Sequence, residues 1–406
     1  MPDVGGGMGH LISTMYHVVP SPNPMTQGLK NRGRTRKDMD ERRQAVEELT
    51  GAKLTIIANC PFDPQLAEKN VENMIGTMPV PLGFVGPLLV KGDDADGEFI
   101  VPLATTEGAL IASVNRGSSV ITAAGGATVM VVKDEMTRGP VFRARDIRHA
   151  AEAARWIEDN LDAVKAAAEA TTRRGRLVRA TPYIVGRSLF LRFAFSTGDA
   201  MGMNMATIAS EAAARLIEES TGVTLVSVSG NMCVDKKPSA LNAICGRGKT
   251  VLADVTVPRA LLEERMHTTP EAVAETCYRK CSIGSALSAS IGSNAHVANM
   301  LAAVYIATGQ DPAQVVEGSM GTTTAEVVDG DLYMSVRLPS IEVGTVGGGT
   351  RLPAQAEALS MMGCLGDGKA VKLAEIIGAV VLAGELSTLC AQAAGHLGAA
   401  HGRLGR

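Results

Sequence analysis

The stretch "VFRARDIRHAAEAARWIEDNLDAVKAAAEATT" at residues 141–172 decides the fold. It predicts a short strand and then a strong helix, for which Asp146 is the candidate N-cap. Two strands around Gly186, a helix and a further strand are predicted next, from "RLVRATPYIVGRSLFLRFAFST" (176–197), "MNMATIASEAAARLIEEST" (203–221) and "GVTLVSVSG" (222–230). This β-α-β-β-α-β order is the ferredoxin-like pattern, and it predicts a small domain over residues 139–227.

The rest of the chain surrounds this insert. "RKDMDERRQAVEELTG" (36–51) predicts a helix closed by Gly51, within a mostly helical segment at residues 1–60. After residue 229, Gly-rich turns alternate with Ala-rich helices. We therefore expect an α+β chain in which residues 61–138 and 228–406 form a large domain interrupted by the small one.

The composition narrows the function classes. The chain has 406 residues, of which 46% are hydrophobic and 20% charged, as in an ordinary globular protein. A net charge of −3 and only 3% aromatic residues argue against a nucleic-acid partner. The seven cysteines form no C-x-x-C pair, which favours a reducing cytoplasm and no metal site. No apolar run reaches the ~18–20 residues of a membrane span, so we expect a soluble protein without a membrane partner.

Two adjacent lysines stand out in "SGNMCVDKKPSALN" (229–242). Lys236 and Lys237 follow Asp235 and precede Pro238, among small and apolar residues. A lysine fixed in such a loop can stabilise a developing alkoxide or pair with a carboxylate. A solvated surface pair explains the pattern as well, so both interpretations stay open.

Two acids are candidates for proton chemistry. Glu107, in "PLATTEGALIAS", has small apolar neighbours, so we expect it to be poorly solvated. Burial favours the neutral, proton-donating form of a carboxylic acid. An acid that only favours a helix start is the alternative. Asp311 follows Gly309 at a predicted helix end, where capping alone accounts for an aspartate.

Histidines and arginines complete the candidates. His296 lies in an Ala/Asn-rich helix, whereas His396 and His401 lie in the last apolar helix, with His401 at its mobile end. A histidine there is either structural or placed to close over a substrate. Four guanidinium groups form a cluster beside a predicted helix end: Arg173, Arg174, Arg176 and Arg179. The cluster is suited to phosphate recognition, and a plain solvated helix terminus is the alternative.

A classical dinucleotide fold is not expected. "GTVGGGT" (344–350) does not match G-x-G-x-x-G, and it follows no convincing strand-helix-strand unit.

Seven strings, in order from residue 72 to 401, carry a resemblance. They are "ENMIGTMPVPLGFVGPL", "PLATTEGALIASVNRG", "GDAMGMNM", "SGNMCVDKKPSALN", "IGSNAHVANMLAAVYIATGQDPAQ", "GTVGGGT" and "AAGHLGAAH". Together they resemble the 3-hydroxy-3-methylglutaryl-coenzyme A (HMG-CoA) reductase family, in its class I form. The resemblance implies a large HMG-CoA-binding domain and an inserted ferredoxin-like NADP-binding domain.

The same resemblance implies an activity and an assembly. The family reduces HMG-CoA to mevalonate with two NADPH, releases coenzyme A and supplies the mevalonate pathway of isoprenoid biosynthesis. Its active sites lie between subunits, so we expect a homodimer or a homotetramer.

Four residues match the family's catalytic positions. Glu107 matches the proton donor to the substrate oxygen, and Lys236 the lysine that stabilises the oxyanion. Asp311 matches the aspartate that links these two groups. His401, in the family's G-H-x-x-x-x-H pattern, matches the histidine that protonates the departing thiolate.

Other residues match contact positions. Those for the substrate or for coenzyme A are Glu72, Asn115, Arg116, Arg138, Ser229, Asp235, Lys237, Lys280, His296 and Asn299. Those for the cofactor are Thr172, Arg173, Asp199, Met201, Gly202, Met203, Asn204, Gly347 and Gly348. The family has a serine at the position of Thr172, and its hydroxyl binds the 2′-phosphate of NADPH. The threonine of this chain keeps that hydroxyl.

Two alternatives are open at this point. One is the same fold run oxidatively, with NAD, mevalonate and coenzyme A consumed. The other is a non-catalytic acyl-coenzyme A binding protein, which is expected to lack one of the four catalytic residues.

Overall fold

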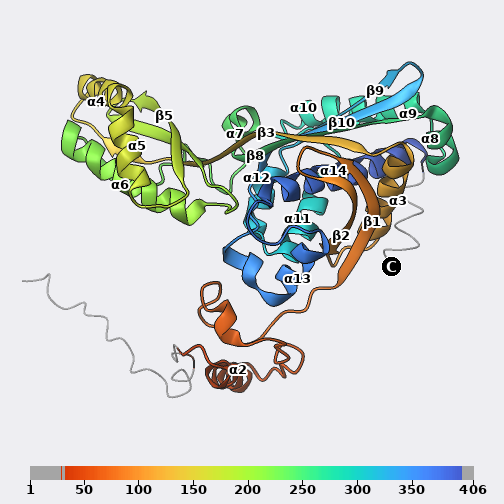
Figure 1. Cartoon of the computed structure of the whole chain (residues 1–406), viewed down its shortest axis with the longest axis horizontal. Coiled ribbons are helices and arrows are strands. Elements are labelled where there is room, and N and C mark those ends of the chain that lie inside the picture. The colour runs from red at the N-terminus through yellow and green to blue at the C-terminus, as the bar shows by residue number, and fades with distance from the viewer. Residues whose placement is uncertain (1–28, 30–32, 396–406) are drawn as a thin grey trace, which may run out of the picture. The chain divides into compact units, whose positions relative to one another are not determined.

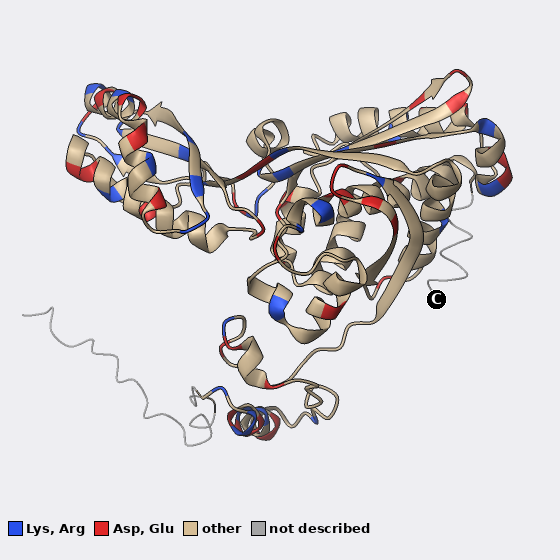
Figure 2. Cartoon of the chain, in the orientation of Figure 1, with Lys and Arg blue, Asp and Glu red and all other residues tan. Residues whose placement is uncertain are grey.

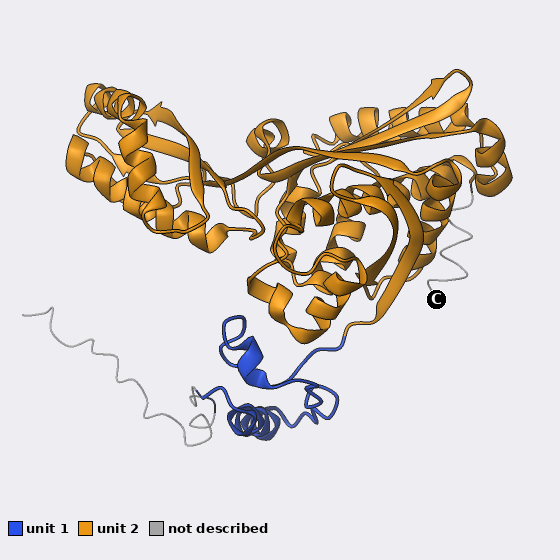
Figure 3. Cartoon of the chain, viewed as in Figure 1, with its two compact units in different colours: residues 1–79 blue, residues 80–406 orange. Residues whose placement is uncertain are grey.

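The computed structural model describes residue 29 and residues 33–395. The chain forms two compact units, residues 1–79 and residues 80–406 (Figure 3). The three-part division expected from the sequence sets its borders elsewhere and stays a prediction.

In the first unit, one helix has well-defined ends. Helix α2 (Arg36–Thr50) begins in a capping box, in which Thr35 and Asp38 each accept a hydrogen bond from the other's backbone N–H. It ends at Gly51, which has a φ of 71°. The predicted helix and its glycine end are therefore confirmed. A short 3₁₀ turn, η2 (Pro64–Ala67), follows.

The second unit is built on one long sheet, and the part described first is largely antiparallel. Its strand order there is β2-β1-β3-β8-β10-β9, and only the pair β1–β3 is parallel. The strands are β1 (Leu82–Lys91), β2 (Asp96–Ala104), β3 (Ala127–Arg138), β8 (Gly248–Val257), β9 (Thr322–Val328) and β10 (Asp331–Ile341). The predicted α+β class is confirmed, since helices pack against this sheet (Figure 1).

The core of this part is closed by helices rich in small residues. Helix α14 (Ala370–Ala393) packs against β3, β8 and helix α3 (Leu110–Ala123). The close approach depends on Gly117, because a Cβ there would stand 1.9 Å from the carbonyl oxygen of Ala383. Helix α11 (Val297–Thr308) packs on β2 and α14 and carries no charged side chain (Figure 2).

Helix α14 corrects one expectation from the sequence. By length and composition it is apolar enough to cross a membrane, although we expected no such run. However, 94% of its apolar window is buried inside the structure, so its apolar surface is covered by the chain's own core.

Met136, near the end of β3, and residues between β3 and β8 form a second hydrophobic core. The strands β4 (Val141–Arg143), β5 (Arg176–Val185), β6 (Ser188–Ser196) and β7 (Thr224–Ser227) pair in the antiparallel order β7-β4-β6-β5. Helices α4 (Ile147–Asp159), α5 (Leu161–Glu169) and α6 (Met203–Thr221) contribute apolar side chains to this core. The predicted strands and the helix α6 are confirmed, in the ferredoxin-like strand order.

The first predicted helix of this segment is, however, two helices. Helix α4 (Ile147–Asp159) has Asp146 as its N-cap, as expected, and helix α5 (Leu161–Glu169) follows after one residue. Asn160 separates them with a φ of −114° and a ψ of 27°. Its side chain donates to the carbonyl oxygen of Trp156 at 2.8 Å, a local bond that competes with the helical ladder.

Strand β3 connects the two cores directly. Its residues 128–135 pair with β8, and its last three pair with β6. The remaining helical elements are α7 (Ala240–Cys245), α8 (Arg259–Met266), α9 (Pro270–Cys277), the π-helical η3 (Tyr278–Gly284), α10 (Ser285–Leu287), η4 (Pro312–Gln314), α12 (Val315–Gly318), η5 (Gly348–Arg351) and α13 (Pro353–Met361).

Candidate active site

The loop that follows β7 carries the two lysines. The amine of Lys236 forms an ion pair with Asp311, with 2.7 Å between Nζ and Oδ2. Asp311 also caps η4, because its Oδ1 accepts the N–H of Ala313 at 3.0 Å. One carboxylate oxygen of Asp311 therefore caps the turn, and the other pairs with the lysine; its catalytic role stays a prediction.

The neighbours of Lys236 differ from it in what they contact. The exposed Lys237 donates from Nζ to the carbonyl oxygen of Asp235 at 3.0 Å. The Asp235 carboxylate lies 3.0 Å from NH2 of Arg247 and 3.7 Å from NH1 of Arg138. Arg138, at the end of β3, thus faces a protein carboxylate, whereas Lys237 keeps its amine at the surface.

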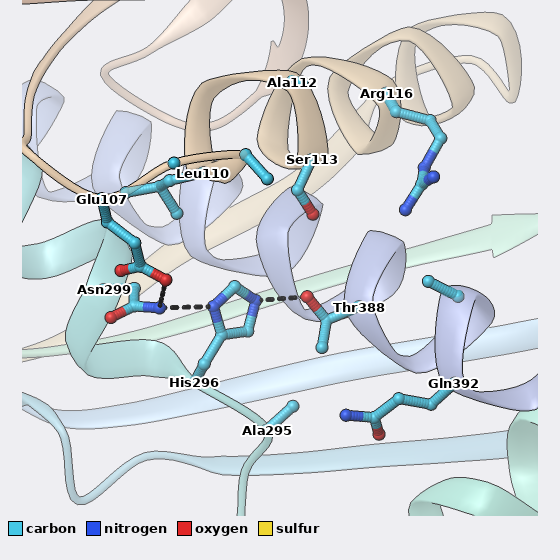
Figure 4. Close-up of a pocket in the computed structure, with 13 residues that line it drawn as sticks. Glu107, Leu110, Ala112, Ser113, Arg116, Ala295, His296, Asn299, Thr388 and Gln392 are labelled. Atoms are coloured by element: carbon cyan, nitrogen blue, oxygen red, sulfur yellow. Dashed lines mark hydrogen bonds between the residues drawn. The ribbon is translucent and has the colours of Figure 1, made fainter. Parts of the chain in front are cut away.

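A second group of predicted residues is linked by hydrogen bonds (Figure 4). Asn299 Nδ2 lies 3.2 Å from Glu107 Oε1 and 3.3 Å from His296 Nδ1. On its other side, His296 Nε2 lies 3.0 Å from the carbonyl oxygen of Gly384 and 2.7 Å from Thr388 Oγ1. Since a carbonyl only accepts, the imidazole proton sits on Nε2, and Nδ1 accepts from Asn299.

These side chains line a cavity of about 250 Å³ between α3, the start of α11 and α14. His296 is the N-cap residue of α11 and not an interior helix residue. Glu107 lies ahead of α3 and is exposed in the single chain, so the expectation of a poorly solvated acid is wrong for one chain. The reason is that its small neighbours leave the cavity open beside it.

The predicted coenzyme A contacts are distributed. Arg116 lines this same cavity and donates to the hydroxyl of Ser387 at 2.8 Å. Its neighbour Asn115 lines another cavity, of about 360 Å³, and accepts the N–H of Gly86 at 3.0 Å. Glu72 is an exposed residue of the first unit.

Two other predicted substrate residues lie nearby. Lys280, exposed on the π-helical η3, lines a cavity of about 600 Å³ to which His296 also contributes. Ser229 lies at the start of the lysine loop, with its hydroxyl 3.9 Å from the sulfur of Cys233. His396 and His401 lie outside the described residues.

The predicted cofactor residues partly converge. Thr172, Arg173, Asp199 and Gly202 line a cavity of about 280 Å³, together with Arg174. Of the other predicted residues, Met201 and Met203 pack against the second core, and Asn204 lies in the first turn of α6. Gly347 and Gly348 adopt positive φ angles of 75° and 52° at the start of η5.

Asp199 is held by backbone donors. Its carboxylate accepts the N–H groups of Gly368, Lys369 and Ala370 at 2.7, 3.0 and 3.1 Å, at the start of α14. Burial by itself raises the pKa of Asp199, but the three donors outweigh it and lower the pKa below its ordinary value. Asp199 therefore remains an anion that anchors this segment to α14.

Four residues around the site were not predicted from the sequence: Arg247, Glu317, Glu385 and Thr388. Glu385 carried a signal, because an acid inside the apolar helix "VVLAGELSTL" must find buried donors. Glu317, in "AQVVEGSMG", carried none. Across residues 33–395, no group of three His, Cys, Asp or Glu side chains is arranged to hold a metal ion.

Comparison with known proteins identifies the family. A family model described as hydroxymethylglutaryl-coenzyme A reductase matches residues 38–406. The 3-hydroxy-3-methylglutaryl-coenzyme A reductase of Haloferax volcanii is 56% identical over 372 residues, which cover 90% of this chain and 92% of that protein. The protein of the same name from Methanocaldococcus jannaschii is 54% identical over 372 residues, with 90% and 92% covered.

A solved structure agrees in fold. The class II 3-hydroxy-3-methylglutaryl-CoA reductase from Streptococcus pneumoniae, bound to NADPH in open conformations, matches with a TM-score of 0.66. It is 22% identical and covers 81% of this chain and 79% of its own, which shows a shared fold. With the family model matching most of its length, this chain belongs to the hydroxymethylglutaryl-coenzyme A reductase family.

Proposed function

We propose that this chain reduces HMG-CoA to mevalonate with two NADPH and releases coenzyme A, in the mevalonate pathway of isoprenoid biosynthesis. Membership of the reductase family supports the reaction. The observation that carries it is the 2.7 Å ion pair between Lys236 and Asp311, in a loop whose sequence matches the family's.

Lys236 stabilises negative charge on the substrate. A thioester carbonyl becomes an oxyanion as it is reduced, and a fixed cation stabilises this charge more in the transition state than in the ground state. Asp311 fixes the direction of the amine. Glu107, whose carboxylate borders the same cavity as His296, donates the proton to the substrate oxygen.

The other substrate residues bind rather than react. Lys237 and Lys280, both with exposed amines, pair with the substrate carboxylate. His296 and Asn299 hydrogen-bond the substrate oxygens from the cavity of about 250 Å³. His401 protonates the departing thiolate, because a histidine titrates near neutral pH.

The cavity lined by Thr172, Arg173 and Arg174 suits the phosphate-bearing end of a phosphorylated dinucleotide. The Arg173 guanidinium and the Thr172 hydroxyl match the donors that a 2′-phosphate requires, and the Arg174 guanidinium beside them pairs with Asp367 at 2.7 Å. When bound, NADPH supplies the two hydrides. Arg173→Ala is expected to raise the KM for NADPH about 10-fold or more and to leave that for NADH unchanged. Arg176→Ala is the matched control, because Arg176 pairs with Glu169 and does not line this cavity.

The active form is a homodimer or a homotetramer with sites between subunits. In the single chain, the Glu107 and Lys236 groups are bonded separately, and Leu287 and Ile244 are 88% and 77% exposed. A partner subunit would bring the Glu107 group and the Lys236 group together in one site, and it would cover such exposed apolar side chains. Light scattering after size exclusion measures the assembly, and a fully active monomer would contradict it. The seven free cysteines favour the cytoplasm.

The decisive experiment follows nicotinamide absorbance with HMG-CoA and either NADPH or NADH, together with thiol release. Two NADPH oxidised per coenzyme A released is the expected result. A strong preference for NADH would favour the oxidative reaction. Binding of coenzyme A without oxidation of either cofactor would reject the reductase activity.

A further inference from the structure

The backbone of Lys236 is held in an unusual conformation. Its φ is 58°, in the left-handed region that non-glycine residues rarely adopt, and Val234 nearby has a φ of 50°. Such conformations persist where the surrounding structure imposes them, and they concentrate at functional sites. The contacts of this loop therefore identify what imposes the conformation.

One buried carboxylate contacts the loop at this point. Oε1 of Glu317, from α12, accepts the backbone N–H of Lys236 in a short hydrogen bond. Its Oε2 accepts from Asn242 Nδ2 at 2.9 Å, and the same amide lies 3.1 Å from the carbonyl oxygen of Val234. Glu317 is fully buried, so these bonds are shielded from water.

The charge of Glu317 is balanced by Arg247, which is also fully buried. NH1 of Arg247 lies 2.9 and 3.1 Å from the two oxygens of Glu317, and NH2 lies 3.0 Å from Asp235. One guanidinium thus connects the carboxylate under Lys236 to the acid that precedes it. Its planar shape fixes both in one arrangement.

A second acid, Glu342, borders this pair from strand β10's end. It lies 3.3 Å from NH1 of Arg247 and is fully buried. Burial, followed by the negative charge of Glu317, raises the pKa of Glu342 well above its ordinary value. A raised pKa favours the neutral form of Glu342, which leaves the charge of Arg247 to Glu317 and Asp235.

We propose that Glu317, fixed by Arg247, is the positioning residue of Lys236: it holds the Lys236 backbone in the left-handed conformation that directs the amine to Asp311 and the substrate oxygen. This inference rests on the proposed role of Lys236. Glu317 itself acts through the lysine and does not touch the substrate.

Glu317→Gln tests the proposal with almost no change in shape. Each oxygen of Glu317 accepts from two donors, so either orientation of the glutamine amide sets an N–H group against an N–H group. We expect kcat to fall about 10- to 100-fold, as for a small misplacement of a reacting group. The KM for NADPH is expected to stay unchanged, since other residues line that cavity.

Glu342→Gln is the matched control. It makes the same chemical change in the same buried cluster, but Glu342 does not accept the Lys236 N–H, and glutamine imitates the neutral form that its raised pKa favours. We expect kcat within twofold of the native value. If Glu317→Gln keeps its kcat, or if Glu342→Gln loses as much, the cluster is only structural and the proposal is wrong.

Hydrogen exchange at the Lys236 amide gives a readout that does not depend on activity. The native amide should be strongly protected, and the protection should fall in Glu317→Gln but not in Glu342→Gln. Rapid exchange in the native protein would overturn the proposal even if the variants fail to fold. Arg247→Lys keeps the positive charge but loses the planar guanidinium that pairs with both acids. It should show an intermediate loss of protection at the Lys236 amide.

The same measurements separate two failures. If Lys236→Ala retains turnover, the proposed role of Lys236 is wrong, whatever Glu317 does. If Lys236→Ala is inactive and Glu317→Gln is fully active, only the positioning role is wrong.

Discussion

Two buried glutamates hold two parts of the candidate site, and they do so differently. Glu317 accepts the backbone N–H of Lys236, and Glu385 accepts the backbone N–H of His296 at 2.7 Å. Both are fully buried. Each therefore fixes the main chain of a site residue, while other residues orient its side chain.

The difference lies in how each charge is balanced. Glu317 faces the guanidinium of Arg247. In the described part of the chain, the donors to Glu385 are neutral: the N–H groups of Ala295 and His296 and the hydroxyl of Thr323, each at 2.7 Å. Those two N–H groups stand at the start of α11, where the helix dipole favours a negative charge.

The charge balance predicts how well each of the two buried glutamates tolerates substitution. Removing the charge of Glu317 leaves a buried guanidinium only partly paired, which is costly. Removing the charge of Glu385 leaves only partial dipole charges, and the Thr323 hydroxyl can turn to accept. Substitution of Glu317 should therefore destabilise the protein more than substitution of Glu385.

The largest expected effect is that of Lys236→Ala. The substitution removes the amine but keeps the backbone N–H that Glu317 binds, so it separates chemistry from anchoring. We expect kcat to fall at least about 10²- to 10³-fold, as for loss of a group that stabilises an oxyanion. The melting temperature should stay near the native value.

Lys237→Ala is the control for this experiment, because its exposed amine is proposed to bind the substrate carboxylate. It should raise the KM for HMG-CoA more than it lowers kcat. Near-native turnover by Lys236→Ala would remove the lysine from the chemistry.

The second prediction compares the two anchors by stability. Glu317→Gln should lower the free energy of unfolding by roughly 3–5 kcal/mol, because it breaks a buried ion pair. Glu385→Gln should cost roughly 1–3 kcal/mol, because it leaves one buried N–H without an acceptor. Urea unfolding of both variants measures the difference, and equal losses would show that the counter-ion of Glu317 does not matter.

The sequence predicted the elements better than the anchors. The strands and helix α6 of the second core follow from alternation and amphipathic spacing, which are local properties. The split at Asn160 does not follow from them, because it depends on one side chain that donates to the carbonyl oxygen of Trp156. The resemblance to a family placed Lys236 and Asp311 together, and the 2.7 Å ion pair agrees.

The anchors were missed for a physical reason. Glu317 and Arg247 are 70 positions apart, and their pairing depends on how α12 meets the start of β8. No periodicity or spacing reports such a contact. The exposure of Glu107 was also mispredicted, since small neighbours in sequence do not reveal whether a cavity lies beside them.

The third prediction concerns the pH dependence of stability. The pKa of Glu342 in the folded protein lies well above 4.5, its ordinary value, because of burial and the charge of Glu317. A raised folded-state pKa stabilises the fold fully below the unfolded-state value, and this contribution is lost as the pH rises toward the folded-state value. Glutamine does not titrate, so Glu342→Gln lacks this loss.

The stability of Glu342→Gln relative to the native protein should therefore increase with pH. The expected slope is roughly 1 kcal/mol per pH unit between about pH 5 and the raised pKa. Urea unfolding at several pH values measures it. A difference that is independent of pH would mean that Glu342 is ionised beside Glu317, and the charge balance around Arg247 would need revision.

The smallest expected effect tests the His296 side of the comparison. Thr388 Oγ1 lies 2.7 Å from His296 Nε2, and the carbonyl oxygen of Gly384 lies 3.0 Å from the same atom. Because the carbonyl remains, Thr388→Val should cost only about 1 kcal/mol of stability. The imidazole loses one of the three contacts that orient it, so the KM for HMG-CoA should rise a few-fold with kcat nearly unchanged. Thr388→Ser, which keeps the hydroxyl, should restore the native KM. If Thr388→Val lowers kcat as strongly as Glu317→Gln, the side chain of His296 is positioned for chemistry, and the contrast between a rigid lysine anchor and a tolerant histidine anchor fails.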